Sequence, residues 1–158
     1  MDKVDTNEMK GREHFKEDLG KWYIMAFSKK KSSREDGWMT ARTDYNRTYI
    51  CEIKNYEDPE NPRPYTKYVK HGVDYGYQID YDKIDYLVTK GMETNRIPIL
   101  YARFDDMTYV WDLTYIPYEE RKKLKKTNKH GYAYGEKETS WQTYLYIDEA
   151  IWSKPTTT

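Results

Sequence analysis

Glu52 and Lys54 are the two residues of this sequence whose types and spacing most directly suggest chemistry. They follow an apolar run, Tyr-Ile-Cys at 49–51, that predicts a buried strand. Side chains alternate along an extended strand, so Glu52 and Lys54 should lie on one face and Cys51 and Ile53 on the other. The segment therefore presents a carboxylate beside an ammonium group at the end of a core strand.

A second carboxylate, that of Asp36, is expected to lie near this pair. The segment 37–54 predicts a β-hairpin that turns at the Asp-Tyr-Asn segment 44–46, because Asp and Asn are turn formers. Residues whose numbers sum to about 88–91 then face each other across the hairpin. This register sets Asp36 across from the region of Glu52 and Lys54, so that two carboxylates and a lysine converge.

Two carboxylates and a backbone carbonyl are oxygen ligands that suit a hard divalent cation. Asp36 and Glu52, with the carbonyl of Ile53, are therefore candidate ligands of Mg²⁺ or Mn²⁺. Such a metal lowers the pKa of a bound water and polarises a phosphodiester oxygen, while Lys54 orients the water or stabilises developing charge. The chemistry expected of such an arrangement is phosphodiester hydrolysis, with Asp36, Glu52 and Lys54 as candidate catalytic residues.

These residues must be positioned by a sheet, and the neighbouring sequence predicts a sheet with helices. Apolar residues at helical spacing predict helices over 7–21 and about 75–95. Short runs rich in aromatic and apolar residues predict strands at 22–28, 96–104 and 107–113. The expected fold class is α/β, with a mixed β-sheet flanked by helices.

The remaining segments are expected to complete a single domain, with a core over about 7–113 and a C-terminal extension over about 114–158. Three prolines and little periodicity predict a long loop at 55–73. The basic segment 117–126 opens with a proline, which predicts a first helical turn. The tail, 131–152, is expected to add one or two strands.

Composition narrows the classes of partner. Lys+Arg 27 balances Asp+Glu 27, so no overall field favours nucleic acid or membrane, and phosphate contacts must come from local patches. One cysteine, Cys51, excludes an internal disulfide and is interpreted as a small buried hydrophobe. Three widely separated histidines give no spacing typical of zinc ligands.

The expected localisation is intracellular, in the cytoplasm or nucleoid. No apolar run approaches the roughly 20 residues that span a bilayer, and the N-terminus lacks the apolar stretch of a signal peptide, so we expect no membrane partner. The 18 tyrosines, with abundant Lys, Asp and Asn, suggest an AT-rich genome such as that of a virus or phage. The compartment could therefore be that of an infected host cell.

Asp36, a hairpin and Glu52-Ile53-Lys54 after an apolar strand together resemble the PD-(D/E)xK nuclease superfamily, whose restriction-endonuclease-like fold has an α-β-β-β-α-β core. The resemblance covers about residues 10–113 and is closest to the archaeal-type Holliday junction resolvases. It implies a Mg²⁺- or Mn²⁺-dependent endonuclease that acts on branched or duplex DNA. A resolvase should also be a symmetric homodimer, because two matched cuts need two related sites.

The resemblance implies further site residues. Glu13 in "KGREHF" matches a glutamate on the N-terminal helix of those resolvases and would add an acid to the metal site. The stretch "SKKKSSRED" resembles their Ser- and Lys-rich loop, which implies that Ser32 and Ser33 contact DNA near the cleavage site. On the helix after the motif, Gln78 or Lys83 would contact the scissile region.

Basic residues supply candidate contacts to the DNA backbone. They are Lys29, Lys30, Lys31 and Arg34 in the loop before Asp36, and the lysine-rich segment 121–126. The tryptophans, by contrast, are interpreted as core and sheet packing and not as surfaces on which bases stack.

Departures from the family pattern leave alternatives open. Glu35 precedes Asp36 where a proline is common, and the hairpin is longer than the family pattern, so Asp44 is an alternative first acid. Alternative functions are a restriction- or repair-type nuclease and a catalytically inactive nuclease-fold module that binds DNA or protein. A third alternative is an unrelated α+β interaction module in which the Glu-x-Lys pair is incidental.

Overall fold

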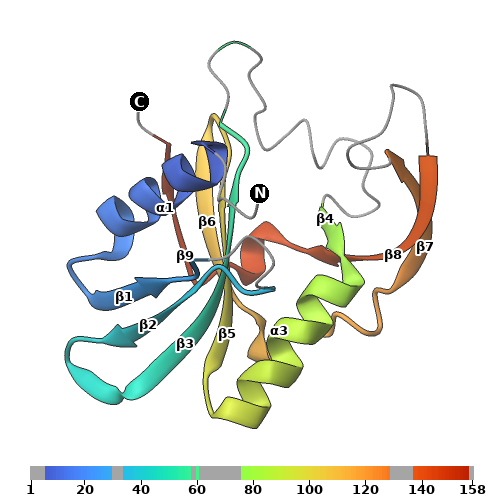
Figure 1. The fold of residues 1–158 in the computed structure, drawn as a ribbon. Helices are drawn as coiled ribbons and strands as arrows, with labels where there is room; N and C mark the ends of the chain where they lie inside the picture. The colour runs from blue at the N-terminus through green and yellow to red at the C-terminus, as the bar shows by residue number, and fades with distance from the viewer. Residues whose placement is uncertain (1–5, 30–33, 58–59, 61–75, 129–136, 157–158) are drawn as a thin grey trace.

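The computed structural model describes residues 6–29, 34–57, 60, 76–128 and 137–156 of the chain. These residues form a mixed α/β structure with a six-stranded sheet, a three-stranded sheet and two α-helices (Figure 1). One helix lies on each side of the larger sheet. The predicted fold class, a mixed sheet flanked by helices, is confirmed.

The helices are α1 (Thr6–Leu19) and α3 (Tyr81–Thr94). The larger sheet contains β1 (Tyr23–Phe27), β2 (Gly37–Ala41), β3 (Asp44–Asn55), β5 (Ile97–Arg103), β6 (Met107–Asp112) and β9 (Trp152–Pro155), in that spatial order. The smaller sheet contains β4 (Tyr77–Asp80), β8 (Lys137–Leu145) and β7 (Lys123–Asn128), in that spatial order. Single turns of 3-10 helix lie at Leu113–Tyr115 and Ile147–Glu149.

α1 covers one face of the larger sheet because its buried positions recur at helical spacing. The buried residues of this helix are Gly11, Phe15, Asp18 and Leu19. Phe15 and Leu19 pack in one apolar cluster with Ile53 of β3 and Tyr101 of β5. A Cβ at Gly11 would lie 3.1 Å from the Cβ of Asn55, so the absence of a side chain permits the helix to approach the end of β3 closely.

β2 and β3 pair in the register predicted from the sequence. Gly37 lies opposite Cys51, and the numbers of paired residues sum to 88 as far as Thr40. The tight turn of the hairpin lies at 42–43 instead of 44–46, because the register shifts after Thr40. The end of the hairpin that carries the Glu-x-Lys pair is unaffected by this irregularity.

α3 covers the opposite face of the larger sheet and connects β3 to β5, which pair in parallel. Ile84 and Leu87 of this helix are fully buried in a cluster with Leu100 of β5. The helix ends at Thr94, where Asn95 adopts the left-handed conformation with φ 55° and its N–H bonds back to the last turn. This crossover is what brings the first turn of α3 to the sheet beside β3.

Two sequence predictions about the smaller sheet are wrong. The helix expected from about residue 75 begins at Tyr81, because Tyr77–Asp80 pairs with β8 as a strand. The segment 117–126 is not helical: it contains a turn at 118–121, and β7 begins at Lys123 and pairs with β8. In both places, pairing with a strand distant in sequence outweighs the local helix signals.

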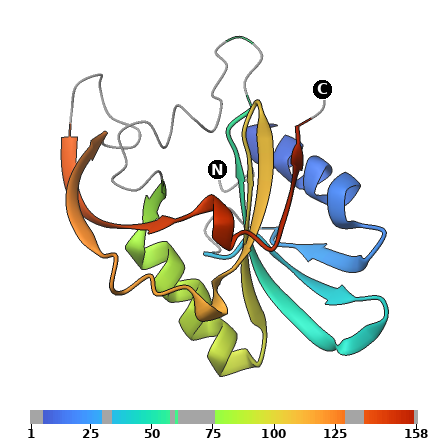
Figure 2. The same cartoon turned by 180° about the vertical axis from the view of Figure 1, so that it is seen from behind.

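The smaller sheet shares a core with the larger one. The ring of Tyr77 stacks on that of Trp111, with centroids 5.9 Å apart, and Leu145 of β8 is buried in the same cluster. Seen from behind, the smaller sheet and α3 lie on the same side of the larger sheet, away from α1 (Figure 2). Within the predicted segment 131–152 the described residues form β8, whereas β9, at the edge of the larger sheet beside β6, begins at Trp152 and extends beyond that segment.

Replacing Ile84 by Ala should lower the free energy of unfolding by about 2–5 kcal/mol, because the change removes a fully buried side chain where α3 meets the sheet. Urea denaturation followed by circular dichroism measures this loss. Met92→Ala is the matched control, since Met92 lies on the same helix and is 81% exposed. The control should change the unfolding free energy by no more than about 0.5 kcal/mol. Equal losses for the two variants would contradict the docking of α3.

Candidate active site

β3 positions Glu52 inside the molecule, on the face of the sheet that α3 covers. Glu52 is only 4% exposed, whereas Cys51 and Ile53 pack in the cluster on the α1 face, so the predicted alternation is confirmed. Burial raises the pKa of the Cys51 thiol well above its ordinary range, which agrees with its interpretation as a small hydrophobe. The carboxyl of Glu52 is thus the polar group of this strand that is held in the interior.

Asp36 lies immediately before β2, at the end of the β2–β3 pairing. Its backbone N–H donates to the carbonyl of Cys51 at 2.9 Å, and its own carbonyl accepts from the N–H of Ser28 at 2.8 Å. The Oδ2 atom of Asp36 accepts a hydrogen bond from the N–H of Ile53 at 2.7 Å. Main-chain and side-chain bonds therefore fix this carboxylate beside the Glu-x-Lys segment, as the predicted register required.

Lys83 lies in the first turn of α3, and its side chain reaches the same site from the helix that covers this face of the sheet. Its Nζ lies 2.9 Å from Oε2 of Glu52 and donates a hydrogen bond of 2.8 Å to the carbonyl of Arg34. Oε2 of Glu52 is buried and is paired by charge, yet no hydrogen bond of good geometry satisfies it within the described residues. Of the two residues predicted to lie on this helix, the structure brings Lys83 to Glu52.

Burial raises the pKa of Glu52 from its ordinary 4.5 to about 8, and the adjacent Asp36 adds to the shift by hydrogen bonding and by charge repulsion. The positive charges of Lys54 and Lys83 act in the opposite direction and favour the ionised carboxylate. A buried acid between a second acid and two cations is typical of functional sites, where pKa values are often strongly shifted.

Lys54 lies two residues beyond Glu52 on the same face of β3. Its side chain is half-buried, and its positive charge offsets part of the rise in the pKa of the Glu52 carboxyl. The ammonium group therefore acts on the Glu52 carboxyl without being enclosed. A group in this position can hold a water or a phosphate oxygen next to them.

The residues present fit a divalent cation with an incomplete protein shell. Asp36 and Glu52 supply two adjacent carboxylates whose mutual repulsion a cation would relieve. Within the described residues, Oε2 of Glu52 has the ammonium group of Lys83 beside it but no hydrogen bond of good geometry. The N–H and C=O of one strand residue point toward the same neighbouring strand, so the carbonyl of Ile53 is directed to the side of Asp36. Within the described part of the chain no three acidic, histidine or cysteine side chains form a cluster, so water would complete the shell, as Mg²⁺ tolerates.

Other predicted site residues lie elsewhere. Glu13 is on α1, which packs on the face opposite to Glu52; its side chain is 69% exposed and forms an ion pair with Lys16 at 4.0 Å. Asp44 is at the far end of β3 from Glu52, where its Oδ1 accepts from the N–H of Asn46. The structure therefore favours Asp36 over Asp44 as the first acid and does not bring Glu13 to the site.

The candidate DNA contacts are divided in the same way. Gln78 is on β4 and not on a helix, and its Oε1 accepts from the hydroxyl of Tyr144 at 3.4 Å. Lys29 is exposed at the end of β1, and Arg34 is exposed beside α3. The predicted contacts Lys30, Lys31, Ser32 and Ser33 lie outside the described residues.

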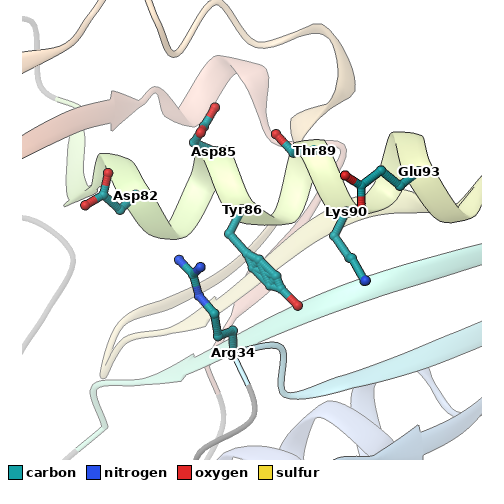
Figure 3. A pocket seen from close by; sticks show the side chains of 7 residues that line it. All are labelled: Arg34, Asp82, Asp85, Tyr86, Thr89, Lys90 and Glu93. Atoms are coloured by element: carbon teal, nitrogen blue, oxygen red, sulfur yellow. The ribbon is translucent and has the colours of Figure 1, made fainter.

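Sequence reasoning missed Tyr86 and Glu35. The hydroxyl of Tyr86 donates to Oε2 of Glu35 at 2.8 Å, and the guanidinium of Arg34 lies 4.2 Å from the centre of the Tyr86 ring. These contacts fasten the segment before Asp36 to α3, beside an open polar cavity of about 500 Å³ (Figure 3). The sequence contained a signal for Tyr86, because this residue is about one helical turn after Lys83 and therefore lies on the same side of the helix.

No protein-family model, curated protein or solved structure matches this chain. Among the helices formed by the described residues, none has the length and apolar character needed to cross a membrane.

The pH dependence of stability should reveal the buried carboxyl of Glu52. Below about pH 4.5 this group is protonated in both the folded and unfolded states, so it imposes no ionisation penalty. As the pH rises from 4.5 to about 8, the unfolded chain releases this proton before the folded protein does, and the free energy of unfolding falls. The glutamine side chain of the Glu52→Gln variant does not ionise, so the free energy of unfolding of this variant should not fall in this way.

The variant should therefore become more stable than the unaltered protein by roughly 2–5 kcal/mol at pH 8, with a much smaller difference at pH 4.5. Urea denaturation in EDTA at several pH values measures the difference. Glu120→Gln, at an exposed Glu-x-Lys sequence outside the site, is the control and should follow the unaltered protein. Parallel curves for all three proteins would show that Glu52 titrates normally.

Proposed function

We propose that this chain is a divalent-metal-dependent endonuclease that hydrolyses DNA phosphodiester bonds. The observation that carries the proposal is the position of Asp36, immediately before β2, next to Glu52 of β3, with the charges of Lys54 and Lys83 acting on Glu52. The order α1-β1-β2-β3-α3-β5 also follows the α-β-β-β-α-β order of the restriction-endonuclease-like core, with β4 as an additional strand. Geometry and element order thus support the same resemblance independently.

Asp36, Glu52 and the carbonyl of Ile53 would hold Mg²⁺ or Mn²⁺. When bound, the metal would lower the pKa of a coordinated water and polarise a phosphodiester oxygen. Lys54 would orient the attacking water and stabilise the charge that develops on the phosphate. The hydrogen bond from the Ile53 N–H holds Asp36 in one orientation, so this ligand needs no reorganisation before reaction.

Lys83 would regulate the charge of Glu52. Its ammonium group is 2.9 Å from Oε2 and favours the ionised carboxylate that a metal requires. Because Lys83 also donates to the carbonyl of Arg34, it ties the segment before Asp36 to the same carboxylate. The two acids are therefore positioned in part by one lysine.

The proposed substrate class is branched DNA, as for the Holliday junction resolvases that the sequence resembles. This finer assignment rests on the motif resemblance, because a fold and a metal site do not fix the substrate. A restriction- or repair-type nuclease is the alternative within the same chemistry. A resolvase would act as a homodimer, so that two related sites make matched cuts.

Cleavage of labelled four-way junction, flap, single-stranded and linear duplex DNA tests the proposal. With Mg²⁺ or Mn²⁺, the unaltered protein should cut at least one of these substrates, with junctions preferred. Asp36→Asn, Glu52→Ala and Lys54→Ala should each reduce the rate by at least about 10²-fold, because each change removes a ligand or a charge-stabilising group. Gel separation of the products measures the rate and locates the cuts.

Glu120→Gln is the matched control for cleavage, since Glu120 belongs to an exposed Glu-x-Lys sequence and should leave the rate unchanged. Cutting of substrates other than junctions would support the nuclease and reject the resolvase. No metal-dependent cutting that requires Glu52 would reject the enzyme.

A second candidate function is a nuclease-fold module that binds DNA or protein without cutting. One specific observation favours it: the carboxyl of Glu52 has a pKa of about 8 and already has the ammonium group of Lys83 as its counter-charge. Such a site could be stable without metal. Absence of any Mg²⁺- or Mn²⁺-induced rise in melting temperature at pH 8, together with intact DNA binding, would select this candidate.

A further inference from the structure

The smaller sheet carries a dense group of lysines at its edge. Strand β7 is the edge strand, and Lys122, Lys123, Lys125 and Lys126 lie on it or immediately before it. Within the part of the chain that the structure describes, none of these four ammonium groups forms an ion pair with a carboxylate. In a chain of zero net charge, this edge is a local source of uncompensated positive charge.

Exposed apolar side chains accompany the lysines. Trp141 of β8 lies opposite Leu124 of β7, and the two are 46% and 54% exposed. Directly opposed residues share one face of a sheet, so this face combines an indole and an aliphatic side chain. The ammonium group of Lys122 lies 4.7 Å from the ring centre of Trp141 and 4.2 Å from that of Tyr81.

We propose that this lysine and tryptophan face, formed by Lys122, Leu124, Lys126 and Trp141, is a docking surface for an unpaired DNA strand. Lysines in this density can neutralise successive phosphates, and an exposed indole offers a surface on which an unpaired base stacks. The inference deepens the proposed function and rests on it for the choice of DNA. It assigns to the C-terminal extension the task of holding a single-stranded part of a branched substrate.

The position of the surface suits this task. Tyr81, which contacts Lys122, and Lys83, which contacts Glu52, are two residues apart in the first turn of α3. Residues at this spacing lie on opposite sides of a helix, so the first turn of α3 separates the candidate active site from the docking surface. A strand crossing this turn would reach both.

A plainer role for the lysines is protection of an edge strand. Charged residues, lysine especially, prevent edge strands from pairing with other chains. That role explains charge on β7 but not the exposure of Trp141 and Leu124 on the same face, because exposed apolar groups favour association. The two roles make different predictions for Trp141. Removal of its indole should weaken DNA binding if bases stack on it and should leave DNA binding unchanged if the lysines only protect the edge strand.

Fluorescence anisotropy of labelled oligonucleotides in EDTA separates binding from cleavage. Trp141→Leu should weaken binding of single-stranded DNA about tenfold and should affect linear duplex DNA much less, because only unpaired bases can stack. Lys122→Gln/Lys126→Gln should weaken binding of both forms. For single strands it should reduce the slope of log affinity against log salt by about 1.4, the value for two lost phosphate contacts.

The chain offers a closely matched control. Trp22 is also 46% exposed, and the ammonium group of Lys21 lies 4.3 Å from its ring centre, but this pair lies between α1 and β1. Trp22→Leu and Lys21→Gln should leave DNA binding unchanged. Melting temperatures of all variants, measured by circular dichroism, show whether each one is folded.

Each outcome decides the inference. Normal DNA binding by the folded Trp141→Leu variant and by the folded double lysine variant would overturn the inference. If the double lysine variant binds DNA normally but self-associates, the lysines protect the edge strand instead. Weakened binding by both variants, with no effect of the controls, would establish the surface. Glu52→Ala separates this result from the nuclease proposal, because it should bind DNA normally and fail to cut it. Binding through this face without any metal-dependent cleavage would reject the nuclease and keep the surface.

Discussion

The burial of the Glu52 carboxyl beside a second carboxyl is the constraint on which the surrounding structure depends. Burial and Asp36 both oppose its ionisation, as its pKa of about 8 reflects. Lys83 from α3 and Lys54 from the same strand offset part of this cost. The starting position of α3 is therefore constrained, because the first turn of this helix must bring Lys83 to the sheet. An apolar residue would stabilise this position more simply, which supports the proposal that the buried acid has a functional role.

The relation between the two acids depends on strand register. A shift of β2 by one residue along β3 would turn its side chains to the opposite face and remove Asp36 from Glu52. The bonds that Asp36 makes to Cys51 and Ile53 close the end of the pairing and oppose such a shift. The irregular turn at the other end of the hairpin can vary without changing the site, because the paired stretch from Gly37 to Thr40 lies between them.

The sequence was sufficient to predict the parts of the site that depend on local periodicity. Alternation along one strand placed Glu52 and Lys54 on one face, and a hairpin register placed Asp36 across from them, as the structure confirms. The position of Gln78 on a strand could not be predicted, because its segment becomes a strand only through pairing with β8, more than sixty positions later in the chain. The helix expected at 117–126 failed for the same reason.

The net charge of this chain says little about its local surfaces, because the structure distributes its charges unevenly. Arg103 and Arg121 are paired with Glu57 and Glu149, and Lys83 is paired with Glu52, so these cations hold the fold or the site together. Pairs of this kind cancel in the total and contribute little to the field outside the protein. The field that a distant phosphate meets is set instead by cations without partners. Among the described residues the lysines of β7 form no ion pair, so a neutral chain can still present the positively charged surface that the proposed DNA contact requires.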